Sequence, residues 1–330
     1  MKWFAFRRAL ALEEAGRFRE ARDAFAEVGS AEAWARAGAC STRLGELALA
    51  VRQFRTARDA EPGLADHWLN YANACRRVGD SVEAGAAFDE ALKRAPDRPD
   101  ILYYRAEADG DRMTLSAMQG ARRAFRVLCG RLERPAGAAE IEATGFPVER
   151  PLIFLRNLAL EKQLLDEGAA ALTEFVDRKP GTSDAAWVAP AALNHRGLLF
   201  AAAGRFDEAR RDYEASLAAR PSDDVRYNLA MLHVRRHAWD AARREFAAFA
   251  RRHPRSPVAT FGPAVMAETR GDLPEAVRLY RVFLDRHAAA PPSPAELATL
   301  DVPANWTARA RTFLDATGRP GEGGVHEVSE

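Results

Sequence analysis

A sequence repeat constrains the fold of this chain more than any other feature. The segments that begin at Ala31 and Ala65 align without a gap, and six pairs of matching residues lie 34 positions apart. The pairs are Trp34 and Trp68, Gly45 and Gly79, Ala50 and Ala84, Phe54 and Phe88, Ala57 and Ala91, and Pro62 and Pro96. A period of this length is typical of stacked helical units, none of which can bury its apolar face alone.

The same frame returns in the second half of the chain. Ala209, Ala242 and Ala276 recur at spacings of 33 and 34 positions, as do the aromatic residues Tyr213, Phe246 and Tyr280. Glycine just past a first helix adopts the left-handed conformation easily, and proline ends a second helix. Small residues predict close approach of two helices, and the aromatic residues fill the space between neighbouring units.

This pattern resembles the tetratricopeptide repeat (TPR) of bacterial multi-repeat TPR proteins, closely in residues 31–98 and 190–288. The matching residues are Trp34 and Trp68 at position 4, Gly38 and Gly197 at position 8, and the turn glycines Gly16, Gly45, Gly79, Gly204 and Gly271. Two departures are His237 in place of a turn glycine and Pro263 at position 7 of the last clear repeat. The resemblance implies an all-α fold, a right-handed α-solenoid of helix-turn-helix repeats.

The repeats divide the chain into four predicted parts. We expect an N-terminal array over residues 1–133, in which the segment up to residue 133 forms a longer amphipathic capping helix. Residues 134–151 combine Pro, Gly and Ala without a stable apolar face and predict a loop or linker. Residues 152–317 are expected to form a second array with a closing helix, and residues 318–330 a disordered tail.

Composition and motifs argue against several classes of protein. Lys and Arg number 48 against 47 Asp and Glu, so no strong overall field attracts nucleic acid or anionic lipid. No catalytic, phosphate-binding or cofactor-binding motif occurs, and we expect neither an enzyme nor a bound cofactor. His233 and His237 have helical metal-ligand spacing but lack a third ligand, so packing or surface roles are favoured. Three cysteines without paired spacing and the absence of a membrane-length apolar run predict a cytoplasmic protein without a membrane partner.

The TPR resemblance implies that residues on the first helix of each repeat line a concave groove. In the first array these positions carry amides and arginines beside an aromatic wall, and in the second array a less charged set. Amides hydrogen-bond a peptide backbone and arginine pairs with carboxylates. The residues predicted to bind a partner are Arg36, Asn70, Asn73, Arg77, Tyr104, Asn194, Tyr227 and Asn228.

We therefore predict a non-enzymatic adaptor that binds a segment of a partner protein in the groove. One alternative is a nucleic-acid-binding solenoid that uses arginine clusters, although the near-neutral charge makes nucleic acid the less favoured partner. Those clusters lie at Arg122, Arg123, Arg126, Arg131 and Arg134 and along residues 235–255. The other alternative is a self-assembling structural subunit, because uncapped solenoid ends expose stackable apolar faces and favour homo-oligomers.

Overall fold

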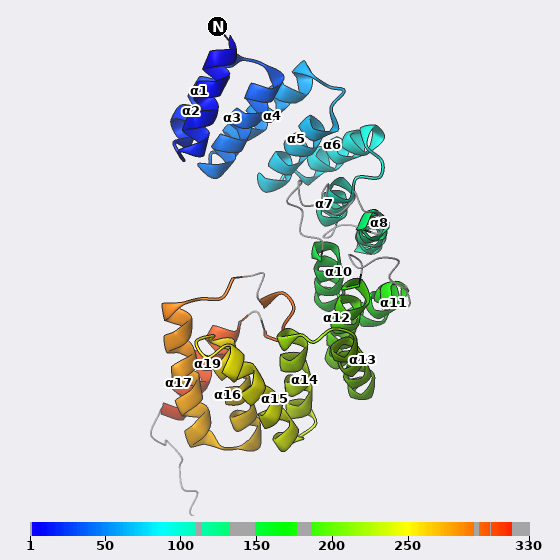
Figure 1. Cartoon of the computed structure of the whole chain (residues 1–330), viewed down its shortest axis with the longest axis vertical. Coiled ribbons are helices and arrows are strands. Elements are labelled where there is room, and N and C mark those ends of the chain that lie inside the picture. Colours follow the sequence, from blue (N-terminus) through cyan, green and yellow to red (C-terminus); the bar gives the residue numbers. More distant parts are fainter. Residues whose placement is uncertain are drawn as a thin grey trace, which may run out of the picture. The chain divides into compact units, whose positions relative to one another are not determined.

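The chain is an all-α solenoid of helix-turn-helix repeats, as predicted. The computed structural model describes residues 2–109, 114–132, 149–176, 186–293, 297–303 and 305–318, and within these ranges it contains 17 helices and no strand (Figure 1). Two compact units divide the chain, unit 1 from Met1 to Lys162 and unit 2 from Gln163 to Glu330. Most of the predicted linker and nearly all of the predicted tail lie outside the described residues.

Unit 1 consists of helical hairpins whose successive helices pack on one another. Its helices are α1 (Lys2–Glu14), α2 (Phe18–Val28), α3 (Ala31–Arg43), α4 (Leu47–Ala60), α5 (Ala65–Arg77), α6 (Ser81–Arg94), α7 (Pro99–Asp109), α8 (Thr114–Leu132) and α10 (Arg150–Glu161). The 19-residue helix α8 lies in the region where the sequence predicts a longer amphipathic capping helix. Helix α8 packs on α7, and α10 packs on α8 in turn.

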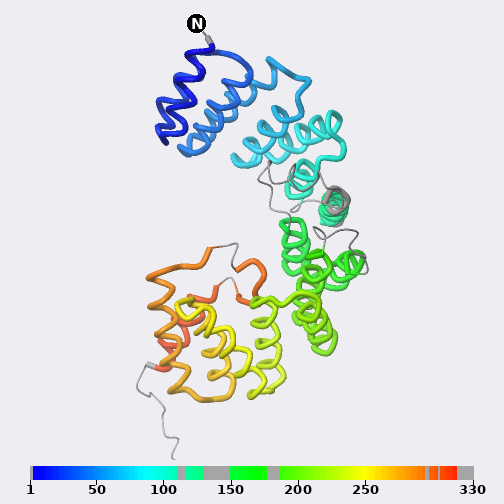
Figure 2. Tube along the Cα trace, viewed as in Figure 1, coloured from blue at the N-terminus to red at the C-terminus, as the bar shows by residue number. Residues whose placement is uncertain are grey.

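Unit 2 continues the same pattern and ends in a single helix. Its helices are α11 (Leu165–Val176), α12 (Val188–Ala202), α13 (Phe206–Ala219), α14 (Asp223–Arg235), α15 (Trp239–Arg252), α16 (Val258–Arg270), α17 (Leu273–Ala289) and α19 (Trp306–Gly318). Figure 2 follows the chain through these hairpins. Helix α19 packs on α17, in the region where the sequence predicts a closing helix.

Left-handed turn residues join the two helices of the repeats. The turn glycines Gly16, Gly45, Gly79, Gly204 and Gly271 have φ between +72° and +86°. His237, which replaces the turn glycine, takes the same conformation at φ +58°. The Ala238 N–H then donates to the carbonyl of His233 at 2.9 Å, as the Arg205 N–H donates to that of Phe200 at 2.8 Å. The turn is therefore kept without glycine, although a side chain is strained in this region.

Glycine at position 8 allows the two helices of a repeat to touch. A Cβ atom on Gly38 would lie 2.8 Å from the Phe54 ring, and one on Gly197 would lie 2.7 Å from the Tyr213 ring. Carbon atoms in contact are normally about 3.5–4.0 Å apart. The aromatic residues predicted to fill the repeats are buried, and so are the small alanines of the pattern. The close approach predicted from the sequence is confirmed.

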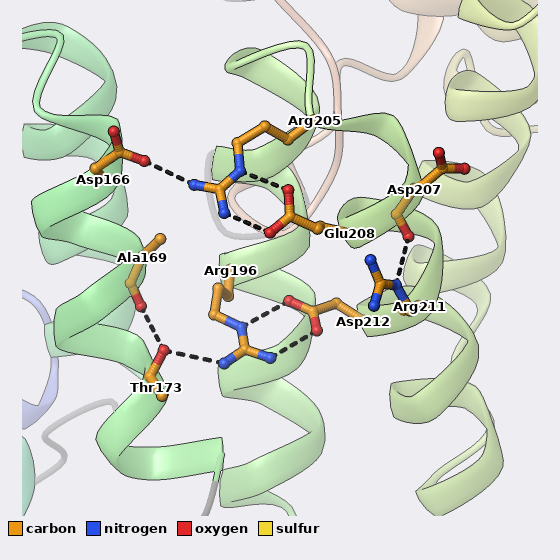
Figure 3. Close-up of polar contacts among 9 residues, drawn as sticks. All are labelled: Asp166, Ala169, Thr173, Arg196, Arg205, Asp207, Glu208, Arg211 and Asp212. Atoms are coloured by element: carbon orange, nitrogen blue, oxygen red, sulfur yellow. Dashed lines mark hydrogen bonds and ion pairs between the residues drawn. The ribbon is translucent and has the colours of Figure 1, made fainter.

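A charged cluster also ties α11, α12 and α13 together (Figure 3). The Arg196 guanidinium on α12 donates two hydrogen bonds to the Asp212 carboxylate on α13, both of 2.7 Å. A third bond of 3.0 Å reaches the Thr173 hydroxyl on α11, which itself donates to the Ala169 carbonyl. One planar side chain thus links three helices, and Asp212 is almost fully buried.

Candidate functional site

Three of the predicted partner-binding residues lie on one helix of unit 1, α5. Asn70 and Asn73 are half-buried and Arg77 is exposed. The Asn73 Oδ1 atom is shielded from solvent and accepts no hydrogen bond from the described residues. Helix α5 contacts both α3 and α7, so its amide side chains stand in the middle of the first-helix surface of this unit. We call this surface the α5 face.

On the α3 side of the α5 face, Arg36 shares one carboxylate with a second arginine. The Arg36 Nη1 atom lies 3.1 Å from Glu13 Oε2, and the Arg43 Nη1 atom lies 2.8 Å from Glu13 Oε1. Arg36 Nε also lies 3.5 Å from the exposed Glu32, and its guanidinium lies 5.9 Å from the centre of the Phe6 ring. Both arginine side chains are about half exposed, so their guanidinium groups remain accessible to a further carboxylate.

On the α7 side, Tyr104 lies close to two guanidinium groups. Its ring centre is 5.8 Å from the Arg76 guanidinium carbon and 5.4 Å from that of Arg150. Arg76 also pairs with Glu107 at 3.0 Å, and the Tyr103 hydroxyl donates to the same carboxylate at 2.8 Å. Burial, followed by the Glu107 charge, raises the pKa of Tyr103 far above its ordinary value. The predicted aromatic wall is therefore half enclosed: Tyr103 is buried and Tyr104 is partly exposed.

In unit 2, the two predicted asparagines hold a returning segment of the chain itself. The Asn228 side chain donates to the Thr299 carbonyl at 2.8 Å and accepts from the Asp301 N–H at 2.7 Å. The same amide donates to Asn194 Oδ1 at 2.8 Å, and Asn194 donates to the Thr299 carbonyl at 3.2 Å. Both asparagines are buried, so no free surface remains on either.

Tyr227, predicted to bind a partner beside these asparagines, is fully buried in the core of unit 2. Its ring packs on Phe246 and Phe249, with ring centres 5.6 and 5.4 Å apart. Burial raises the pKa of its phenol well above the ordinary value. A partner-binding role for Tyr227 stays a prediction, and in the described structure its ring contributes to packing.

Sequence reasoning missed the residues that meet the two asparagines. Thr299 and Asp301 belong to no repeat, and the spacing of the repeats says nothing about where they lie. One signal was present: Asn194 and Asn228 are separated by one full repeat period, which puts two amides on the same face of adjacent first helices. This spacing predicts a polar patch on the first helices, but it does not predict which segment of the chain binds to that patch.

Other chemistry-bearing residues have ordinary structural settings. His233 is partly buried, which lowers its pKa, and the described ranges contain no cluster of three or more His, Cys, Asp or Glu residues placed to hold a metal ion. Cys40 and Cys75 are buried, as predicted for small apolar residues, and burial raises the pKa of both thiols, to about 11 for Cys40. Every helix in the described ranges is too short or too polar to span a bilayer.

The arginines proposed for nucleic-acid binding are interleaved with acidic residues where the structure describes them. Arg236 pairs with Asp207, Arg252 with Asp223, and Arg235 with Asp301. In the other cluster, Arg123 lies 3.6 Å from an oxygen of Asp97. The side chain of Arg131 and all of Arg134 lie outside the described residues.

These features define a solenoid of helical hairpins with its amides on the first helices. The sequence model of the tetratricopeptide repeat family matches residues 42–99, 157–224 and 227–294, more than half of the chain. The chain therefore belongs to the tetratricopeptide repeat family. Repeats of this kind present extended surfaces for protein partners, so the chain is a protein-interaction adaptor at that general level. The family is typically non-enzymatic.

Solved structures similar to this chain come from three bacteria. A tetratricopeptide repeat protein from Parabacteroides merdae has a TM-score of 0.44 and 14% identity over 75% of this chain and 91% of that chain. The C-terminal part of a TPR repeat-containing protein from Cytophaga hutchinsonii has a TM-score of 0.47 and 14% identity over 90% and 100%. The Pseudomonas aeruginosa protein pilF has a TM-score of 0.39 and 14% identity over 82% and 95%. The search of curated proteins gives no match.

Proposed function

We propose that the chain is a non-enzymatic adaptor that binds an extended segment of a partner protein on the α5 face of unit 1. The backbone of the partner segment would be held by Asn70 and Asn73, and its carboxylates by the arginines around them. A role without catalysis and a cytoplasmic location remain predictions from the sequence.

The observation that carries this proposal is the set of hydrogen bonds made by Asn228. Asn228 is the sixth residue of α14, and its amide bonds one carbonyl and one N–H of residues 299–301, which leave a turn of the chain. Asn70 is the sixth residue of α5, so the repeat puts the same side chain at the same place on a first helix of unit 1. What Asn228 does with the chain's own backbone, Asn70 is positioned to do with a partner's backbone.

The charge of the α5 face indicates the chemistry of the partner. Three arginines of this surface pair with three glutamates, and two more arginines lie beside them. The pairs join Arg36, Arg43 and Arg76 to Glu13, Glu32 and Glu107, Arg150 lies over the Tyr104 ring, and Arg77 is exposed on α5. A segment with acidic side chains would relieve the excess positive charge and gain bidentate pairs with arginine. We therefore propose an acidic segment rather than an apolar one.

A comparison of affinity pull-downs tests this function. The bait proteins are the wild type, a variant with alanine at Asn70, Asn73, Arg77 and Tyr104, and a control variant with alanine at Arg52 and Arg244. The control arginines are exposed and lie on the second helices α4 and α15. We expect one partner to be captured by the wild type and the control and to be lost from the quadruple variant.

The captured partner then supplies a direct measurement. An acidic peptide from its sequence should bind the wild type about 5- to 150-fold more tightly than the Asn70→Ala variant, since a lost hydrogen bond between the peptide backbone and the half-buried Asn70 amide costs roughly 1–3 kcal/mol. If all three baits capture the same proteins, the proposed partner binding on the α5 face is wrong. Material that is lost on nuclease treatment would favour the nucleic-acid alternative, and light scattering that shows assembly would favour the structural subunit.

A further inference from the structure

The segment after α17 returns to the first helices of unit 2 before the chain forms α19. Figure 1 shows the described part of this stretch, in orange, beside α14. Residues 299–301 contact Asn194 on α12 and Asn228 on α14, both of which lie far earlier in the chain. An irregular segment thus lies on the face where the sequence predicts partner binding.

The contact to the backbone of this segment has the form of peptide recognition. The Asn228 amide uses its donor on the Thr299 carbonyl and its acceptor on the Asp301 N–H, so it satisfies both polar groups that flank Leu300. Asn194 adds a second donor to the Thr299 carbonyl. Backbone recognition of this kind gives affinity for an extended chain, and side-chain contacts must then supply the selectivity.

Three side chains of the segment make separate contacts that supply such selectivity. Thr299 donates its hydroxyl hydrogen to the Asp224 carboxylate at 2.6 Å, and Arg235 donates to Asp301 at 2.9 Å. Between them, Leu300 is 7% exposed and packs in the apolar core cluster that contains Met231. The face therefore accepts a hydroxyl, an apolar side chain and a carboxylate in that order.

We propose that the face formed by α12 and α14 is a second peptide-binding site, with residues 299–301 as its resident ligand. A partner segment with an apolar residue followed by an acidic residue would bind there by displacing them. The site lies in unit 2 and does not depend on the α5 face. Its occupant is suited to exchange because residues 298–303 form no helix and Leu300 is the one buried residue among 297–303, with Leu297 and Val302 partly exposed at the edge of the same core cluster.

Displacement has a measurable consequence for affinity. A competitor must overcome the resident segment, so its apparent dissociation constant rises by the inverse of the fraction of time that the site is free. A site that is free for about one hundredth of the time binds a competitor about 100-fold more weakly than an empty site. The wild type should therefore bind such a peptide weakly, and a variant with a weakened resident segment should bind it more tightly.

The test uses the full chain and a labelled peptide with the sequence of residues 297–303, Leu-Ala-Thr-Leu-Asp-Val-Pro. The released variant carries Thr299→Ala, Leu300→Ser and Asp301→Ala. We expect it to bind the peptide about 10- to 100-fold more tightly than the wild type does, by fluorescence anisotropy. Adding Asn228→Ala to the released variant should abolish this gain, whereas adding Asn70→Ala in unit 1 should leave it unchanged.

A peptide in which Ser and Asn replace the Leu-Asp pair serves as the matched control and should not bind. The proposal is overturned if the released variant keeps its helical circular dichroism and binds the peptide no better than the wild type. Equal binding with and without Asn228→Ala would also overturn it. The function proposed for unit 1 is unaffected by either result, because its own variants change only the α5 face.

Hydrogen exchange of the unmodified protein tests the inference without any variant. If residues 299–301 dissociate from the face while the rest of unit 2 stays folded, the Asp301 amide becomes exposed to solvent. It should then exchange at least about 100-fold faster than the Leu232 amide in the buried part of α14. Excess peptide with the 297–303 sequence should speed up exchange at Asp301 further. If Asp301 exchanges as slowly as Leu232, the segment opens only when the whole unit unfolds, and it is a fixed part of the core.

Discussion

Replacing Gly197 by alanine should destabilise unit 2 through one clash. The added Cβ would lie 2.7, 2.9 and 3.2 Å from three carbon atoms of the Tyr213 ring, which is fully buried. Overpacking of this kind costs about 1–3 kcal/mol, and the enclosed ring puts this case in the upper part of the range. Alanine regains about 1 kcal/mol of helix propensity relative to glycine. The expected net loss in the free energy of unfolding is therefore about 1–2 kcal/mol.

Urea unfolding followed by circular dichroism, combined with a double-mutant cycle, measures this loss. Tyr213→Leu removes the ring, so Gly197→Ala should cost nothing or stabilise in that background, with a coupling energy of at least about 1 kcal/mol. Gly204→Ala is the matched control: its Cβ meets nothing within 4 Å, and its cost of about 1–2 kcal/mol comes from the φ of +75°. That cost should be the same in both backgrounds.

Two results would refute the packing argument. One is a Gly197→Ala variant as stable as the wild type. The other is a destabilisation that Tyr213→Leu leaves unchanged, because the cost would then come from the backbone rather than from the ring.

Two further predictions concern buried polar groups. Asp212→Ala removes both hydrogen bonds of the ion pair with the largely buried Arg196 and should lower the free energy of unfolding by about 3–5 kcal/mol in urea titrations. The control variant Asp207→Ala removes an exposed ion pair and should lower it by less than about 1 kcal/mol. Equal losses of stability in the two variants would contradict this prediction. Burial, with a smaller effect of Glu13, raises the pKa of Cys40 from 9.0 to about 11. The unfolded thiol ionises first, so stability should fall as the pH rises from 9 toward 11, and Cys40→Ala should flatten that fall. Alkylation of Cys40 in the folded protein as fast as in urea would show that the thiol is not protected.

The repeats were predictable because each repeat residue acts on its immediate neighbours. A turn glycine such as Gly204 determines the conformation of its own turn, and Gly197 meets Tyr213 on the second helix of the same hairpin. Local contacts of this kind are repeated once in every repeat. The sequence pattern therefore predicts both where the helices begin and end and which residues allow them to pack closely. Even the departure at His237 keeps the turn, since its backbone adopts the conformation that glycine would adopt.

The candidate sites were predictable only in part. The sequence placed Asn70 and Asn73 on one helix face, and the structure leaves both half-buried on α5. For Tyr104 the sequence predicted an aromatic surface, but it contained no sign that Arg150 of α10 stacks on its ring. The two residues are 46 positions apart and belong to no common repeat, so no periodic pattern links them.

The sequence by itself determined the family, the hairpins and the positions of the amides on the first helices. Only the tertiary structure decided what each amide meets. Asn228 and Asp301 are 73 positions apart, and their contact depends on the path of an irregular segment rather than on a repeat. A repeat pattern encodes interactions between adjacent helices, which are the same in every unit. The segment that lies on a helix face does not belong to a repeat, so no periodic pattern predicts its position. Its position is determined only when the whole unit folds.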